Sequence, residues 1–115
     1  NTIESSTIYL IVAFNTPRAK IRRLHNALFD AKVKRILRPW TAVTFNRLAA
    51  GCIEGIVCAD VGLHDFLAGK LICQESGAKI THFGEDIDTN PNFVLSNTQI
   101  HKKLVKIVKP IFKTL

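Results

Sequence analysis

An uninterrupted apolar run at residues 8–14 constrains this chain more than any other feature. Its hydrophobic side chains do not alternate with polar ones, so a strand formed there must be covered on both faces. The run is far shorter than the roughly 20 residues that a membrane span needs, and no membrane role is expected. Asn15, Thr16 and Pro17 follow it and are typical of a helix start. The pattern predicts a buried strand that leads into a helix.

The rest of the chain continues this alternation of short strands and helices. Strands are expected at 32–37, 56–59, 78–81 and 92–95, and helices after Pro17, from Thr41 to a C-cap at Gly51, over 63–74, and from about Thr98 with Asn97 as its cap. In the helix over 63–74, the residues expected to face the core are Leu67, Leu71 and Ile72. The alternation predicts one α/β domain over residues 1–115, a three-layer α-β-α sandwich with a mixed sheet of about five strands.

The three cysteines have no C-x-x-C spacing and are odd in number, so neither a disulfide framework nor a zinc site is indicated. Cys52, Cys58 and Cys73 lie among apolar residues, and we expect buried, reduced thiols in a cytoplasmic protein. No Walker-type or dinucleotide glycine loop is present, nor a Gly-x-Ser-x-Gly elbow. These common nucleotide-binding and hydrolase motifs are therefore not what the sequence offers.

The formal net charge is +7, with basic side chains gathered in residues 18–38 and in the last predicted helix. Such clusters attract phosphate, nucleic acid or an acidic protein partner. A solvated basic surface explains the same residues without any ligand. No recognised nucleic-acid module accompanies them, so a basic interaction module stands as the alternative function.

The most informative segment runs from residue 48 to residue 81. Its notable residues, in order, are Ala50-Gly51 at a predicted helix end, Glu54, a strand, and then Asp65, Ala68-Gly69, Glu75 and Gly77. This ordered set resembles the second signature of the inositol monophosphatase superfamily. The segment 92–97, with a helix after it, is similar to the last strand and final helix of that family. The resemblance covers the whole chain loosely and residues 47–101 well.

Asp65 falls in the first turn of a predicted helix, directly after a strand and a short loop. A carboxylate there is favoured by the positive helix end, and open α/β sheets bind ligands where their strands end. From spacing alone, a helix cap is the favoured explanation of Asp65. In the family that this segment resembles, the matching aspartate is a magnesium ligand, which implies that Asp65 holds magnesium and that Thr41 and His64 line the substrate pocket.

The resemblance implies the carboxy-terminal half of a magnesium-dependent phosphomonoesterase that hydrolyses a small sugar, inositol or nucleotide phosphate. Most magnesium ligands of the family come from an amino-terminal half that is not in this sequence. We therefore expect the chain alone to be inactive, to pair with that half or with a partner subunit, and to self-associate through exposed core edges.

Three positions depart from the family pattern. Pro39-Trp40 stands where the family has Gly-Ser or Gly-Thr, Cys58 replaces a substrate-binding acid, and His64 replaces a tryptophan. A proline ring and an indole cannot allow the same close approach of backbone to substrate. These departures leave open a family member that has lost catalysis and serves as a binding module. The acidic segment 85–89 lacks the proline and glycine of the family's metal loop, and it is expected to be a solvated loop.

Overall fold

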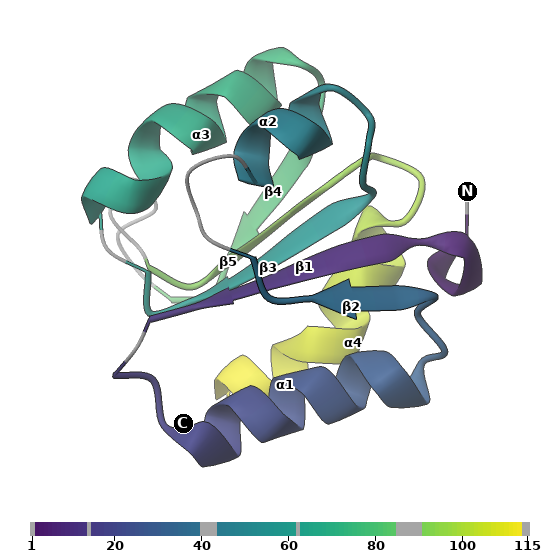
Figure 1. Cartoon of the computed structure of the whole chain (residues 1–115), viewed down its shortest axis with the longest axis vertical. Coiled ribbons are helices and arrows are strands. Elements are labelled where there is room, and N and C mark those ends of the chain that lie inside the picture. The colour runs from purple at the N-terminus through teal and green to yellow at the C-terminus, as the bar shows by residue number, and fades with distance from the viewer. Residues whose placement is uncertain (1, 14, 40–43, 62, 85–90, 114–115) are drawn as a thin grey trace.

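The computed structural model of the chain describes residues 2–13, 15–39, 44–61, 63–84 and 91–113, and for residues 63–65 and 113 it describes the backbone only. Within these ranges, in chain order, the elements are η1 (Ile3–Ser5), β1 (Thr7–Val12), α1 (Arg18–Asp30), β2 (Arg35–Leu37), α2 (Thr44–Ala49), β3 (Gly55–Ala59), α3 (Leu63–Glu75), β4 (Lys79–His82), β5 (Phe93–Ser96) and α4 (His101–Lys113) (Figure 1).

The five strands form one sheet with the order β2-β1-β3-β5-β4. β1 is parallel to both of its neighbours, so that Ile8 lies opposite Ile36 of β2 and Gly55 of β3. β5 runs antiparallel to both β3 and β4 and lies between them. The sheet is therefore mixed, and β1, β2 and β3 all end at the same edge.

Helices cover both faces of this sheet, with α1 and α4 on one face and α2 and α3 on the other (Figure 1). Side chains alternate along β1: Ile8 and Leu10 join the core beneath α1 and α4, while Tyr9 and Ile11 join the core beneath α2 and α3. All four residues are at most 3% exposed. The predicted three-layer α-β-α sandwich with a mixed five-stranded sheet is confirmed, and so is burial on both faces for residues 8–11 of the apolar run.

Several predicted element boundaries shift by a few residues. β1 ends at Val12, and position 14 lies outside the described residues. β2 begins at Arg35 instead of residue 32, because Lys32 takes a left-handed φ of 65° in the turn after α1. Gly51 has a φ of 80°, as expected for the glycine that follows α2.

The start of α4 confirms its predicted cap. The side-chain oxygen of Asn97 accepts hydrogen bonds from the backbone N–H groups of Gln99 and Ile100, each at 3.1 Å. α4 itself begins at His101, a turn later than expected. Within the described ranges, every helix falls short of the length and apolar character that crossing a bilayer requires.

The orientation of α3 is where the sequence prediction is wrong. Leu67, Leu71 and Ile72 do not face the core, since these residues are 46%, 57% and 43% exposed. The side chains that α3 buries against the sheet are those of Phe66, Lys70 and Cys73. The helix is apolar around most of its circumference, so hydrophobic periodicity cannot select which face turns inward.

A glycine in α3 is close to the neighbouring helix α2. A Cβ atom added at Gly69 would lie 2.4 Å from Cγ of Phe45. Real Cβ atoms essentially never come so close, so the glycine allows α3 and α2 to approach each other at this point. The side of α3 that contains Gly69 therefore faces α2, and the leucines of α3 lie on other sides of the helix.

Candidate functional site

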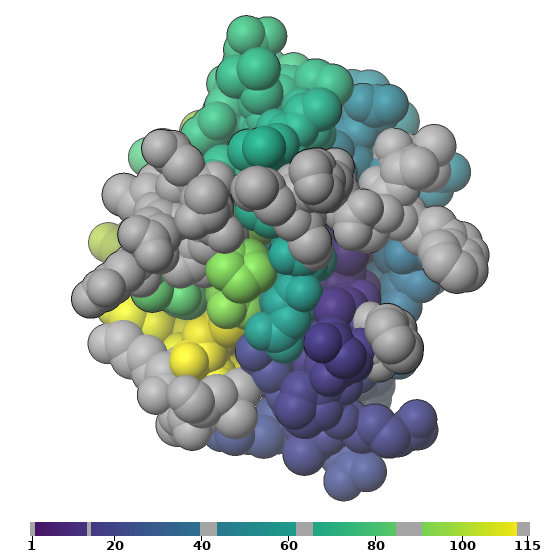
Figure 2. Space-filling model, turned by 90° about the vertical axis from the view of Figure 1, so that its left-hand side faces the viewer, coloured from purple at the N-terminus to yellow at the C-terminus, as the bar shows by residue number. Residues whose placement is uncertain are grey.

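The predicted site belongs to the edge at which β1, β2 and β3 end. Val12 at the end of β1 lies opposite Ala59 at the end of β3. Figure 2 views this edge, with the ends of β1 (purple) and β3 (teal) between α3 above and α1 below. After β3 the chain passes through Asp60, whose φ of 59° is left-handed, and α3 begins at Leu63. The strand-loop-helix junction predicted from the sequence is present at the edge where open α/β sheets bind ligands.

Asp65 is the third residue of α3 and lies in its first turn. The first backbone N–H groups of a helix have no partner within the helix, so a carboxylate near them is stabilised. The side chains of Asp65 and His64 lie outside the described part of the structure, and Thr41 and the acidic segment 85–89 lie outside it entirely. The roles of Asp65, His64 and Thr41 therefore stay predictions.

The described side chains alone do not make a magnesium site. Among them, no group of three or more His, Cys, Asp or Glu residues comes together. Magnesium requires near-octahedral coordination by oxygen, with one or two carboxylates and further ligands from water or substrate phosphate. Asp65 would therefore need further oxygen ligands from beyond the described residues.

An ion pair that sequence reasoning missed fixes the same edge. Lys20 of α1 contacts both carboxylate oxygens of Asp60, at 3.1 and 3.3 Å. The backbone N–H of Asp60 donates to the side-chain oxygen of Asn92 at 3.0 Å, and that of Val61 donates to the carbonyl of Pro91 at 3.3 Å. These contacts tie the β3–α3 connection to α1 and to the segment before β5. An aspartate placed directly after a buried parallel strand was the available sequence signal.

Thr16, in the connection from β1 to α1, has a buried hydroxyl. It is 5% exposed, and its Oγ1 has no hydrogen-bond partner in the part of the chain that the structure describes. A buried hydroxyl without a partner costs about 1–3 kcal/mol, so such groups usually bond to water or to a ligand. Thr16 is therefore a second polar group near this edge, between β1 and α1, that sequence reasoning did not single out.

A buried lysine lies between α3 and the sheet. Lys70 is 7% exposed, and its Nζ lies 5.5 Å from the ring centre of Phe66 and 5.6 Å from that of Phe93. The same Nζ lies 2.9 Å from Nε2 of His82 on β4. The two nitrogens are within hydrogen-bond distance, and which of them donates depends on the tautomer of His82. Lys70 thus takes the inward position on α3 that the sequence pattern assigns to a leucine.

A buried histidine joins α4 to the sheet. Nδ1 of His101 lies 2.7 Å from the hydroxyl of Ser96, and its Nε2 lies 2.7 Å from the hydroxyl of Thr81. Burial, and secondly the charge of Lys79, lowers the pKa of His101. Ser96 is fully buried and both ring nitrogens are occupied, so this trio cannot present a nucleophile to a substrate. Its role is to hold β4, β5 and α4 together.

The cysteines divide between the interior and the surface. Cys58 and Cys73 are buried as expected, whereas Cys52 is exposed, so the prediction is wrong for that residue. Burial raises the pKa of Cys58 well above its usual range and raises the pKa of Cys73 to about 11. Both thiols are therefore protonated at neutral pH, and neither is an activated nucleophile.

No protein-family profile and no curated protein sequence matches the chain. Its fold, however, matches solved structures with a probability of 1.00. They include the IMPase of Thermotoga maritima (TM-score 0.74, 23% identity), the extragenic suppressor protein SuhB of Bartonella henselae (0.81, 24%) and the inositol monophosphatase of Anabaena (0.81, 18%). The resemblance to inositol monophosphatases is thereby confirmed at the level of the fold.

The match covers nearly all of this chain but less than half of the others. The alignments include 97%, 93% and 95% of this chain and 43%, 42% and 45% of those three proteins, in the same order. The chain therefore corresponds to part of an inositol monophosphatase-like fold. More than half of each matched protein has no counterpart in it.

Proposed function

We propose that this chain is the carboxy-terminal part of a magnesium-dependent phosphomonoesterase of the inositol monophosphatase type, which acts on a small sugar, inositol or nucleotide phosphate. The observation that carries the proposal is the position of Asp65. It lies in the first turn of a helix that follows a parallel strand, within a fold matched over 93–97% of the chain by the Bartonella and Thermotoga proteins. By this proposal Asp65 supplies one magnesium ligand, while His64 and Thr41 contact the substrate.

The other ligands would come from the part of the enzyme that this chain lacks. Bound metal ions polarise a phosphate and lower the pKa of a bound water. Asp65 would supply only one of the oxygen ligands that such an ion needs. The unpartnered hydroxyl of Thr16 near the same edge is available to bind water or a substrate oxygen. The chain alone is therefore expected not to hydrolyse phosphate esters.

The exposed face of α3 supports the idea that another layer covers it. Leu67, Leu71 and Ile72 are each more than 40% exposed, and Leu67, Leu71 and Gln74 help to line a surface hollow of about 430 Å³. A helix that is apolar on all sides is usually an interior helix. Because the matched structures are more than twice as long as the matched region, we propose that the missing half packs on this face of α3.

The test joins this chain to the unmatched part of the Bartonella SuhB chain and measures phosphate release from inositol phosphate, sugar phosphates and nucleotides. We expect magnesium-dependent release by the joined protein and none by this chain alone. Asp65→Asn should lower the rate by at least about 100-fold, the upper loss seen when a group that only supports a metal ligand is removed.

Glu75→Gln is the matched control, because it removes a carboxylate at the opposite end of the same helix. Its rate should stay close to that of the unchanged protein. Phosphate release that survives Asp65→Asn, or that does not depend on magnesium, would contradict the proposed role of Asp65.

A basic interaction module is the second candidate, and one observation favours it. The two helices with exposed basic side chains, α1 and α4, lie on the same face of the sheet (Figure 1). Exposed residues there include Arg22, Arg23, Lys102, Lys106 and Lys109. Retention on DNA or RNA that falls with salt, and that is lost when Arg22, Arg23, Lys34 and Arg35 are neutralised, would support this function over the phosphatase.

A further inference from the structure

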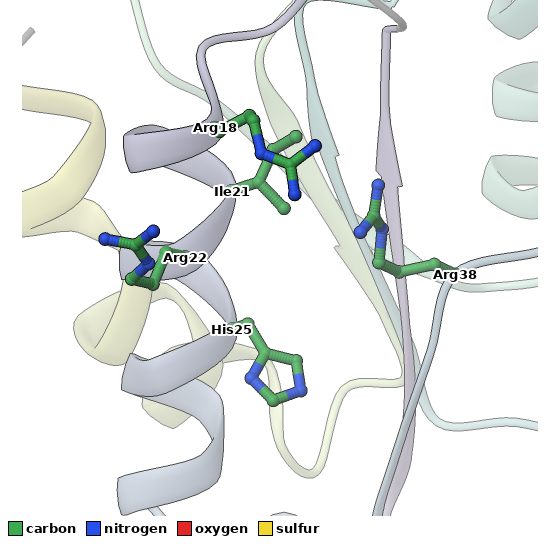
Figure 3. Close-up of a pocket in the computed structure, with 5 residues that line it drawn as sticks. All are labelled: Arg18, Ile21, Arg22, His25 and Arg38. Carbon is green, nitrogen blue, oxygen red and sulfur yellow. The ribbon is translucent and has the colours of Figure 1, made fainter.

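A hollow of about 230 Å³ lies between α1 and the residue that follows β2. Its lining consists of Arg18, Ile21, Arg22, His25 and Arg38 (Figure 3). It lies against α1, which is on the opposite face of the sheet from α3. Three arginines and a histidine line it, and none of the described lining residues is acidic.

The fold brings these side chains together from two segments. Residues 18, 22 and 25 are spaced by four and three along α1, which places them on one side of the helix. Arg38 directly follows the end of β2 at Leu37, on the edge strand of the sheet. In Figure 3 the guanidinium groups of Arg18 and Arg38 face each other near Ile21, with His25 on the same side of the helix. The guanidinium of Arg22 extends to the other side of the helix in this view, so Arg22 lies at the margin of the hollow.

The positive charge of this hollow has no counterpart in the described part of the protein. There, no ion pair or hydrogen bond links the side chain of Arg18, Arg22 or Arg38 to another residue. Asp60, at the edge where β1 and β2 end, pairs with Lys20 and not with these arginines. Like charges that face each other without a counter-ion repel, and a bound anion would remove that repulsion.

The chemistry of the lining selects the class of anion. A guanidinium group is a planar fork that matches the oxygens of phosphate or carboxylate with two hydrogen bonds. A carboxylate has two oxygens, enough for one such fork, whereas a terminal phosphate has three and can bridge Arg18 and Arg38. The volume is below the range of about 300–1,000 Å³ that holds a whole drug-sized ligand. The side chain of Ile21 and the arginine stems add an apolar floor.

We propose that this hollow is a binding site for a small phosphate-bearing anion, held chiefly between Arg18 and Arg38 with Arg22 and His25 at its margin. This site does not depend on the proposed phosphatase function, because none of its residues belongs to the Asp65 junction. A phosphate group can reach it from a free small molecule or from a nucleic-acid backbone, and the experiment separates these two sources.

The experiment titrates pyrophosphate, and separately inorganic phosphate, into the chain at low ionic strength, followed by calorimetry and by backbone amide shifts. We expect saturable binding with shifts centred on residues 18–25 and 38. Arg18→Gln and Arg38→Gln should each weaken pyrophosphate binding by about tenfold, the effect of one lost charged hydrogen bond. Circular dichroism establishes that both variants are folded.

Lys34→Gln is the matched control, since Lys34 is exposed and near in sequence but does not line the hollow. It removes one positive charge, as the arginine variants do, and should change the affinity less than twofold. Absence of saturation, or equal losses in Lys34→Gln and Arg38→Gln, would show only a general charge effect and would overturn the site.

A fluorescent single-stranded oligonucleotide forms the second arm. If the source of the phosphate is a small molecule, pyrophosphate binds in the hollow and the oligonucleotide does not compete at moderate salt. An oligonucleotide that displaces pyrophosphate, and that loses affinity equally in Arg38→Gln and Lys34→Gln, would show a polyanion on a basic surface. That outcome would overturn the assignment to a small anion.

Discussion

The helices α3 and α4 have the same length of 13 residues but opposite relations to their surroundings. On α4 the apolar side chains form one buried stripe, Leu104, Val108 and Ile111, and the remaining surface is largely lysine. On α3 the inward face is set by Phe66, Lys70 and Cys73, while the outer face carries exposed leucine and isoleucine. α4 is therefore an amphipathic surface helix, whereas α3 has the composition of a helix that is covered on both sides.

This difference identifies the face of the molecule that exposes apolar side chains, which is the outer face of α3. Exposed apolar residues are ordinary when they are scattered singly, but a contiguous group on one helix marks a contact surface. On the face with α1 and α4 most exposed side chains are charged, and Phe29, which is 67% exposed, is the one large apolar exception among the described residues of these helices. If the proposed function holds, the part of the matched structures that has no counterpart in this chain is expected to pack on the α3 face. Four predictions test whether α3 and α4 differ as described.

The largest effect is expected from shortening a leucine in each helix. Leu104→Ala should lower the free energy of unfolding by about 2–5 kcal/mol, since Leu104 is fully buried and its loss leaves a cavity. Leu71→Ala in α3 should change it by less than about 0.5 kcal/mol, as for other surface positions. Urea unfolding of the two variants measures both. Equal losses would mean that α3 buries its leucines as the sequence pattern suggested.

The second prediction concerns how α3 is held against α2. Gly69→Ala should destabilise the chain by about 1–3 kcal/mol, because the added methyl group would overlap Phe45. Phe45→Leu in the same chain should recover part of this loss by making room for the methyl group. A double-mutant cycle measured by urea unfolding gives the coupling between the two positions. Coupling near zero would contradict the close approach of the two helices.

The third prediction addresses the uncovered face directly. If Leu67 and Leu71 drive self-association, replacing both by lysine should weaken it by at least about tenfold, or roughly 1.4 kcal/mol. Sedimentation over a range of concentrations measures the change. Asn26→Lys combined with Thr98→Lys adds the same charge at exposed positions elsewhere and should leave the association nearly unchanged.

The smallest effect concerns the polar anchor at the start of α4. Burial lowers the pKa of His101, so the unfolded chain takes up a proton at higher pH than the folded chain does. This histidine therefore contributes stability above the unfolded pKa, near 6.5, which is lost as the pH falls through the lower folded pKa. His101→Gln cannot titrate, so its unfolding free energy should fall less between about pH 7 and pH 5. Parallel slopes in the two proteins would contradict the lowered pKa.

The strand pattern was predictable because its signals are local. An apolar run without alternation indicates burial on both faces, and Ile8 to Ile11 show that burial in full. Gly51 follows the end of α2 because glycine takes a left-handed φ without strain, and Asn97 precedes α4 because its side chain accepts backbone hydrogen bonds. Both signals lie in a single residue. The inward face of α3 was not predictable in this way, because it depends on Gly69 meeting Phe45 from another helix.

In the candidate site, too, the features set by local sequence were predictable and those set by long-range contacts were not. The position of Asp65 after a strand follows from local order in the sequence, together with the resemblance to a known signature. The pairing of Lys20 with Asp60 joins residues 40 positions apart and depends on where α1 crosses the sheet edge. The hollow between α1 and β2 likewise needs the parallel pairing of β1 and β2 before Arg38 can face Arg18.

The position of β5 has a consequence for synthesis on the ribosome. β4 contacts the rest of the sheet through β5, which is made after it and pairs with both β3 and β4. Until residue 96 has left the exit tunnel, β3 remains an open edge and β4 has no strand beside it. A nascent chain of this kind cannot close its sheet gradually from one end, so we expect late, abrupt acquisition of resistance to proteases during translation.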